Sequence, residues 1–139
     1  MIFISHAAQD TPYAEELAAE LKLHGFDAWT DRNLLPGDNW AREIDRALRE
    51  ADVMVALVSP AAAQSEWVQR EWQYALGREK LEGRLIPVLL GRTEISAAPW
   101  IFDTLFPLRN PTPSQVARRV KEVMEGRGNR AKAGSRASS

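Results

Sequence analysis

Short apolar runs alternate with amphipathic segments along most of this chain, and the alternation strongly limits the folds it can adopt. The apolar runs lie at residues 2–5, 26–30, 53–58 and 85–90. Segments with helical spacing of apolar residues lie at 11–23, 39–50 and 66–80, and a last one begins at 112. Strands that alternate with helices are typical of one parallel sheet covered by helices on both faces. The sequence therefore predicts an α/β domain.

The run from Val53 to Val58 is almost continuously apolar and is followed by Ser59 and Pro60. A strand buried on both faces has this composition, and such strands belong to parallel sheets. We expect an irregular loop at 92–103 and a short edge strand at 105–108. In parallel sheets of this kind ligands bind beyond the carboxyl ends of the strands. We therefore expect a functional site in the loops that follow the predicted strands.

Composition excludes several kinds of site. The chain has no cysteine and only two histidines, His6 and His24. A disulfide framework, a thiol nucleophile and a multi-histidine metal centre are therefore excluded, and we expect no metal and no cofactor. Glycine-rich nucleotide-binding motifs and a serine-hydrolase elbow are also absent from the sequence. Ser5, His6 and Asp10 are near neighbours in one loop, which disfavours a catalytic triad.

Charge divides the chain into two parts. The net charge is −1, yet residues 126–139 contain four basic side chains and no acidic one, which leaves residues 1–125 with a net charge of −5. We interpret 1–125 as the folded domain and 126–139 as a flexible basic tail or linker. The acidic domain disfavours nucleic-acid binding by its body. No run is long enough to span a membrane and the N-terminus does not resemble a signal peptide, so we expect a cytoplasmic protein.

The segment 65–72 contains the first candidate site. Trp67 and Glu71 are four residues apart, so a helix places an indole one turn from a carboxylate. Such a pair can stack a planar base and stabilise a cation. The alternative is a half-buried tryptophan beside a solvated glutamate that pairs with Arg70 or Lys80.

The segment 31–40 contains the second candidate site. Leu34 and Leu35 are apolar and precede a Pro36-Gly37 turn. Apolar loop tips are often partner contacts. The alternative is an ordinary connection between a strand and a helix, with Asp38 or Asn39 as the N-cap.

Together these segments resemble a known family. Phe3–His6 resembles the first-strand motif of TIR (Toll/interleukin-1 receptor) domains, although His6 stands where a tyrosine is usual. The loop Asp31–Gly37 is similar to the family's BB loop, and Asp52–Pro60 is similar to its third strand. Ser65–Glu71 resembles the segment that holds the catalytic glutamate in NAD-cleaving members. The resemblance covers most of residues 1–125.

The resemblance implies a flavodoxin-like three-layer fold with a five-stranded sheet in the order 2-1-3-4-5. It also implies one of two functions, because some TIR domains cleave NAD+ and others act only as scaffolds through contacts with other TIR domains. The presence of Glu71 after Trp67 favours an NAD+ nucleosidase that releases nicotinamide and ADP-ribose or a cyclic ADP-ribose. NAD+ would then be the substrate, not a cofactor. A nucleoside deoxyribosyltransferase-like enzyme is a more distant alternative.

By resemblance, Glu71 is the expected catalytic residue. The expected substrate-binding residues are Ser5, His6, Ala7, Asp31, Leu35, Gly37, Ser65 and Trp67. The expected self-association residues are Leu34, Leu35, Pro36 and Trp100, with a hydrophobic plug over the sheet edge as the alternative for Trp100. The family further implies a sensor domain or protein outside this chain and a role in bacterial antiphage signalling.

Overall fold

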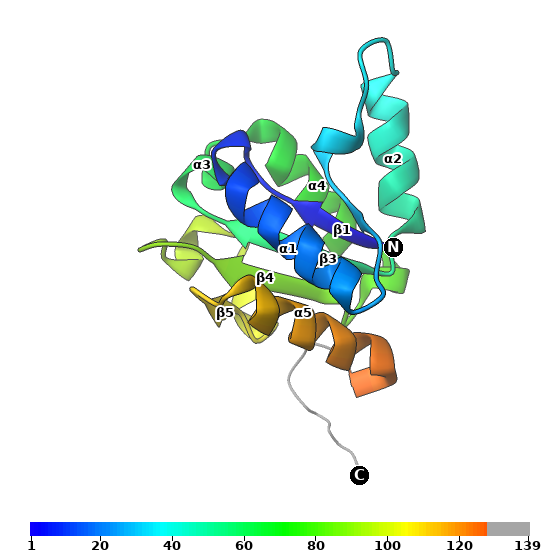
Figure 1. Ribbon diagram of the computed structural model, residues 1–139. Coiled ribbons are helices and arrows are strands. Elements are labelled where there is room, and N and C mark those ends of the chain that lie inside the picture. The colour runs from blue at the N-terminus through cyan, green and yellow to red at the C-terminus, as the bar shows by residue number, and fades with distance from the viewer. Residues whose placement is uncertain (128–139) are drawn as a thin grey trace.

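The computed structural model describes residues 1–127, which form a five-stranded parallel sheet with helices on both faces (Figure 1). The strands are β1 (Ile2–Ser5), β2 (Ala28–Trp29), β3 (Val53–Val58), β4 (Leu85–Leu89) and β5 (Leu108–Arg109). The helices are α1 (Thr11–Leu23), α2 (Trp40–Glu50), α3 (Pro60–Ala63), α4 (Glu66–Leu76) and α5 (Pro113–Glu122). The strand order β2-β1-β3-β4-β5 confirms the expected α/β fold class and sheet order.

The central strand β3 divides the core into two layers. All six of its residues are buried, as the apolar run predicted. Val53, Val55 and Leu57 pack with α1 and α5 on one face of the sheet. The residues between them pack with α2, α3 and α4 on the other face (Figure 1). Because side chains alternate along a strand, one apolar run supplies both layers.

Both edge strands are shorter or displaced compared with the prediction. The run 26–30 forms a strand only at Ala28–Trp29, because the Phe26 N–H donates to the carbonyl of Leu21 and so completes the end of α1. The edge strand expected at 105–108 lies at Leu108–Arg109 instead. Phe106 has a φ of 51°, which is incompatible with an extended strand.

The helices after β3 also differ from the prediction. The helix expected at 66–80 ends at Leu76, where Gly77 follows, and a separate 3₁₀ turn covers Glu79–Leu81. The one-turn helix α3 was not predicted. Ser59 caps it by accepting a hydrogen bond from the Ala62 N–H at 3.1 Å. The region expected to be an irregular loop contains two 3₁₀ turns, Ile95–Ala97 and Trp100–Thr104.

The structure describes only the first two residues of the predicted tail. A π-type turn covers Val123–Arg127, and Gly126 within it has a φ of 95°. The remainder of the tail, 128–139, lies outside the described residues.

Candidate active site

The carboxyl end of β1 brings three of the predicted site residues into the interior. Ser5 is the last residue of β1 and is fully buried beside β3, where it pairs with Ala56. His6 and Ala7 follow and are also buried. This end of the sheet is the position at which parallel α/β folds bind ligands.

Helix α4 brings Glu71 to Ser5. Ser65 caps the helix by accepting a hydrogen bond from the Val68 N–H at 3.2 Å, and Glu71 lies in its second turn. The Ser5 hydroxyl donates a hydrogen bond to Oε1 of Glu71 at 2.7 Å. Glu71 is only 3% exposed, and its other oxygen, Oε2, is buried without a hydrogen-bond partner among residues 1–127. A buried carboxylate oxygen without a partner is costly, and groups of this kind are often functional.

The surroundings of Glu71 favour its neutral form. Burial raises the pKa of Glu71 from 4.5 to about 8, and the negative charge of Asp31 acts in the same direction. The hydrogen bond from Ser5 lowers this pKa and so opposes the effect in part. Burial also raises the pKa of Asp31, against the opposing charge of His6. Neighbouring carboxyl groups whose pKa values are shifted are typical of functional sites.

These results reject the alternative of a solvated Glu71 paired with a neighbouring cation. Arg70 pairs instead with Glu66 at 3.1 Å, and Lys80 lies 3.8 Å from Asp52.

Trp67 lies one helical turn before Glu71 and is 37% exposed. Both residues line a shallow pocket of about 280 Å³ between α2 and α4. Part of the indole is thus available to a planar ligand, in a pocket that Glu71 also lines.

The imidazole of His6 has one satisfied nitrogen and one unsatisfied nitrogen. Nδ1 lies 2.8 Å from the carbonyl oxygen of Ala7. Nε2 is buried and has no hydrogen-bond partner in the described part of the chain. His6 and Glu71 thus each have a buried polar atom for which residues 1–127 supply no hydrogen-bond partner.

The loop between β2 and α2 is held by its own side chains. Asp38 accepts a hydrogen bond from the Leu35 N–H at 2.7 Å, and its own N–H donates to the Leu35 carbonyl at 3.0 Å. Gly37 has a φ of 92°, which the third position of a type II turn requires, with Pro36 before it. Asn39, one of the two expected caps, accepts from the Arg42 N–H at 3.2 Å and begins α2.

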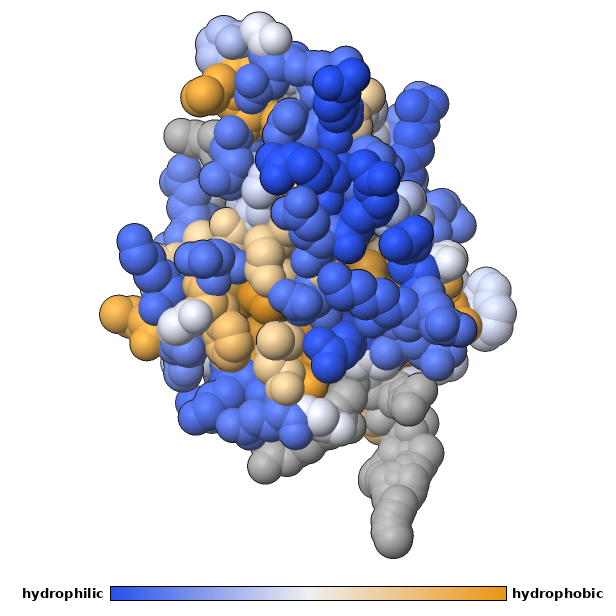
Figure 2. Space-filling model, turned by 90° about the vertical axis from the view of Figure 1, so that its right-hand side faces the viewer, coloured by the Kyte–Doolittle hydropathy of each residue, from blue (hydrophilic) through white to orange (hydrophobic). Residues whose placement is uncertain are grey.

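The two leucines of this loop have different environments. Leu34 packs against the core, whereas Leu35 is 64% exposed. The loop projects beyond the body of the molecule (Figure 1), and Figure 2 shows hydrophobic surface at that end. Leu35, not Leu34, is thus available to a partner.

Trp100 lies in the 3₁₀ turn before β5 and is 79% exposed. The alternative of a hydrophobic plug over the sheet edge is therefore wrong.

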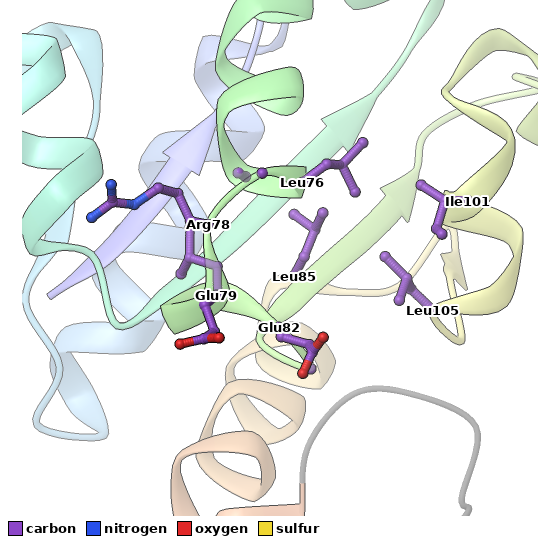
Figure 3. A pocket seen from close by; sticks show the side chains of 11 residues that line it. Leu76, Arg78, Glu79, Glu82, Leu85, Ile101 and Leu105 are labelled. Atoms are coloured by element: carbon purple, nitrogen blue, oxygen red, sulfur yellow. The ribbon is translucent and has the colours of Figure 1, made fainter.

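A separate pocket of about 380 Å³ lies beyond the end of α4, where Leu76, Leu85, Ile101 and Leu105 face one another (Figure 3). Leu85 is the first residue of β4, so this pocket is at the amino ends of the strands. It contains none of the predicted site residues.

One contact near the site was not expected from the sequence. The Ser59 hydroxyl donates a hydrogen bond to Oδ2 of Asp10, which joins the loops after β1 and β3. The sequence contained a signal for it, because both residues follow the carboxyl ends of neighbouring strands.

Within residues 1–127 no group of three or more acidic, histidine or cysteine side chains is placed to hold a metal ion. No helix in the same range is both long enough and apolar enough to span a membrane.

The segments that resemble TIR motifs in sequence thus form the end of β1, the loop before α2 and the first turns of α4. A family model described as TIR domain matches residues 2–112. The chain belongs to the TIR domain family. A solved metazoan TIR-STING receptor from C. gigas, in complex with 2′,3′-cGAMP, shares the fold of this TIR domain. The TM-score is 0.73 at 24% identity, over 88% of this chain and 38% of the receptor.

Two bacterial relatives have names that state an activity. The "2′ cyclic ADP-D-ribose synthase BtTIR" of Bacteroides thetaiotaomicron is 33% identical over 79 residues, which are 55% of this chain and 28% of the relative. The "NAD(+) hydrolase PdTIR" of Paracoccus denitrificans is 38% identical over 72 residues, which are 50% of this chain and 24% of the relative. This TIR domain thus matches about a quarter of the length of these relatives.

Proposed function

We propose that this TIR domain cleaves NAD+ at the bond between nicotinamide and ribose, with Glu71 as the catalytic carboxylate. The observation that carries the proposal is the state of this carboxyl group. One of its oxygens is held by Ser5 at 2.7 Å, and the other is buried without a partner among the described residues. The names of the two bacterial relatives support the same reaction.

The reaction needs little beyond one carboxylate. The bond from C1′ of the ribose to the pyridinium nitrogen breaks, and its electron pair leaves with nicotinamide, which becomes neutral. No acid has to protonate this leaving group, in contrast to ordinary glycosides. The ribose becomes an oxocarbenium-like cation, which the ionised Glu71 stabilises electrostatically. Oε2, for which residues 1–127 supply no partner, would accept a hydrogen bond from a ribose hydroxyl.

Substrate binding favours the ionised form of Glu71. In the structure burial raises the pKa of Glu71 to about 8. The positive pyridinium ring of NAD+ lowers this pKa when it enters the site, because an opposite charge nearby stabilises the carboxylate. Trp67 packs against the nicotinamide. The oxocarbenium is then captured by water, which gives ADP-ribose, or by a group of the same nucleotide, which gives a cyclic product.

The other residues predicted to bind substrate fall into two groups, those that position Glu71 and those that would contact NAD+ directly. Ser5 already bonds to Glu71, and Ser65 already caps α4. We propose that these two act by positioning Glu71. His6, Ala7 and Asp31 would contact the substrate from the carboxyl ends of β1 and β2, and Leu35 and Gly37 would contact it from the loop before α2.

The decisive experiment is NAD+ consumption over a series of protein concentrations, with the products identified by mass spectrometry. Glu71→Gln keeps the size and the acceptor for Ser5 but removes the charge, so turnover should be lost. Glu66→Gln is the matched control, because Glu66 lies on the same helix and its side chain is 85% exposed. Full activity of Glu71→Gln would exclude the proposed role. Exchange of bases on deoxynucleosides without NAD+ cleavage would favour the deoxyribosyltransferase alternative.

We further propose that activity requires self-association through Leu35, Pro36 and Trp100. Both large side chains are exposed, Leu35 at 64% and Trp100 at 79%. A projecting loop that meets a different surface of the next copy makes a head-to-tail contact, which builds open filaments. A sensor outside this chain would trigger that assembly, in keeping with a role in antiphage signalling.

Light scattering against concentration tests the contact. Leu35→Asp should reduce both assembly and NAD+ turnover. Leu23→Asp is the matched control, because Leu23 is 80% exposed at the end of α1, away from the loop. Equal assembly of Leu35→Asp and wild type would exclude the loop as a contact. A wild type that assembles but cleaves no NAD+ would favour the scaffold function.

A further inference from the structure

His6, the residue directly after β1, carries a ring nitrogen that the proposed cleavage does not use. Nδ1 of His6 lies 2.8 Å from the carbonyl oxygen of Ala7. A carbonyl oxygen only accepts hydrogen bonds, so Nδ1 must carry a proton. In the neutral imidazole Nε2 then has a free lone pair, because only one ring nitrogen is protonated. The backbone thus selects the tautomer in which Nε2 is a base.

This lone pair belongs to the residue that directly follows β1, at the same end of the sheet as the contact between Ser5 and Glu71. Nε2 is buried and has no hydrogen-bond partner among residues 1–127. His6 directly follows Ser5, whose hydroxyl holds Oε1 of Glu71. Asp31 interacts electrostatically with both His6 and Glu71. His6 and Glu71 therefore share two neighbours, Ser5 and Asp31.

We propose that His6 is the general base of the second half of the reaction, which deprotonates the hydroxyl that attacks C1′. The inference rests on the proposed cleavage of NAD+. After nicotinamide has left, a water oxygen or a ribose hydroxyl forms the new bond to C1′. Its proton moves to Nε2, which gives an imidazolium that the nearby carboxyl group of Asp31 stabilises. The proton then passes to solvent and the base is restored.

Two nucleophiles separate this role from simple binding. Water carries a proton that must be removed as it attacks. The ring nitrogen of a pyridine such as 3-acetylpyridine attacks with its lone pair and has no proton to lose. Exchange of nicotinamide for 3-acetylpyridine therefore uses the same first step and the same Glu71 but needs no base.

The test measures hydrolysis and exchange in the same protein, at a concentration where the wild type is active. His6→Asn keeps a side-chain N–H near the position of Nδ1, for the Ala7 carbonyl, and removes Nε2. We expect hydrolysis to fall by about 10²-fold or more, the usual contribution of a general base. Exchange should stay within about threefold of the wild type. The matched control is His24→Gln at the exposed end of α1, with both reactions unchanged.

Each other outcome overturns the proposal in a recognisable way. Equal losses of hydrolysis and exchange in His6→Asn would show that His6 binds substrate or supports the fold. Unchanged hydrolysis would show that it has no part in the reaction. If thermal melting shows that His6→Asn is not folded, His6→Gln, which also lacks a basic nitrogen, gives the same comparison. Glu71→Gln should lose both reactions, so a failure of the proposed NAD+ cleavage is distinguishable from a failure of the base role.

Discussion

The buried carboxyl group of Glu71 should make the protein less stable as pH rises. Its pKa is 4.5 when exposed and about 8 in the folded protein. Between these values the unfolded chain has released the proton and the folded protein has kept it, so rising pH favours unfolding. The stabilisation is present below pH 4.5 and is lost as pH rises toward 8.

The size of the effect follows from the two pKa values. Each pKa unit corresponds to 1.36 kcal/mol, so the full cost of ionising the buried group is roughly 5 kcal/mol. Between pH 5 and pH 8 the free energy of unfolding should fall by roughly 3.5 kcal/mol from this group alone. Glu71→Gln removes the titration and retains an acceptor for Ser5. The variant should therefore match the wild type within about 1 kcal/mol at pH 5 and exceed it by roughly 3–4 kcal/mol at pH 8.

Urea unfolding of both proteins at several pH values measures this difference. The protein concentration must stay below that at which copies associate, because association would add its own stabilisation. Glu66→Gln, on the solvent side of the same helix, should show no such growth with pH. A difference between wild type and Glu71→Gln that is constant from pH 5 to pH 8 would refute the reasoning from burial. It would mean that water or a local movement solvates the carboxylate.

Three further predictions follow from the same contacts. Ser5→Ala removes the hydrogen bond that favours the ionised form of Glu71, and such a bond to a charged acceptor is worth about 1.5–3 kcal/mol. It should raise the pKa of Glu71 further, move the acid limb of the pH–rate profile of kcat/KM to higher pH and reduce activity at pH 7 about tenfold or more. Gly37→Ala strains a residue with a φ of 92° and should destabilise the loop by about 1 kcal/mol, seen as faster amide exchange there. Asn39→Ala removes the cap that accepts from the Arg42 N–H and should lower stability by about 1 kcal/mol in urea unfolding.

The fold could be predicted because its signals are local. The apolar run at Val53–Val58 and the helical spacing after it recur along the chain, and together they specify parallel strands with helices between them. The edges were harder to predict. The Phe26 N–H bonds to the end of α1, and Phe106 takes a positive φ. The spacing of apolar residues in the sequence predicts neither feature.

The site was predictable in part for the same reason. Trp67 and Glu71 are joined by helical spacing, so their proximity follows from the sequence. The hydrogen bond from Ser5 to Glu71 joins residues 66 positions apart, and its existence depends on how α4 packs on β1. The burial of Glu71 is also a tertiary property. Its position on the helix is also compatible with a solvated carboxyl group. Its pKa is raised only because other elements of the fold bury the side chain.

The two edges of the sheet limit how copies of this domain can associate. β2 pairs with β1 at two positions, and β5 pairs with β4 at two positions. A strand this short offers too few backbone groups for another chain to extend the sheet, which protects proteins against edge-to-edge aggregation. The long apolar strand β3 is in the centre with a partner on each side. The proposed array of these domains would therefore form through loops and helices, and single surface substitutions should disrupt it without unfolding the sheet.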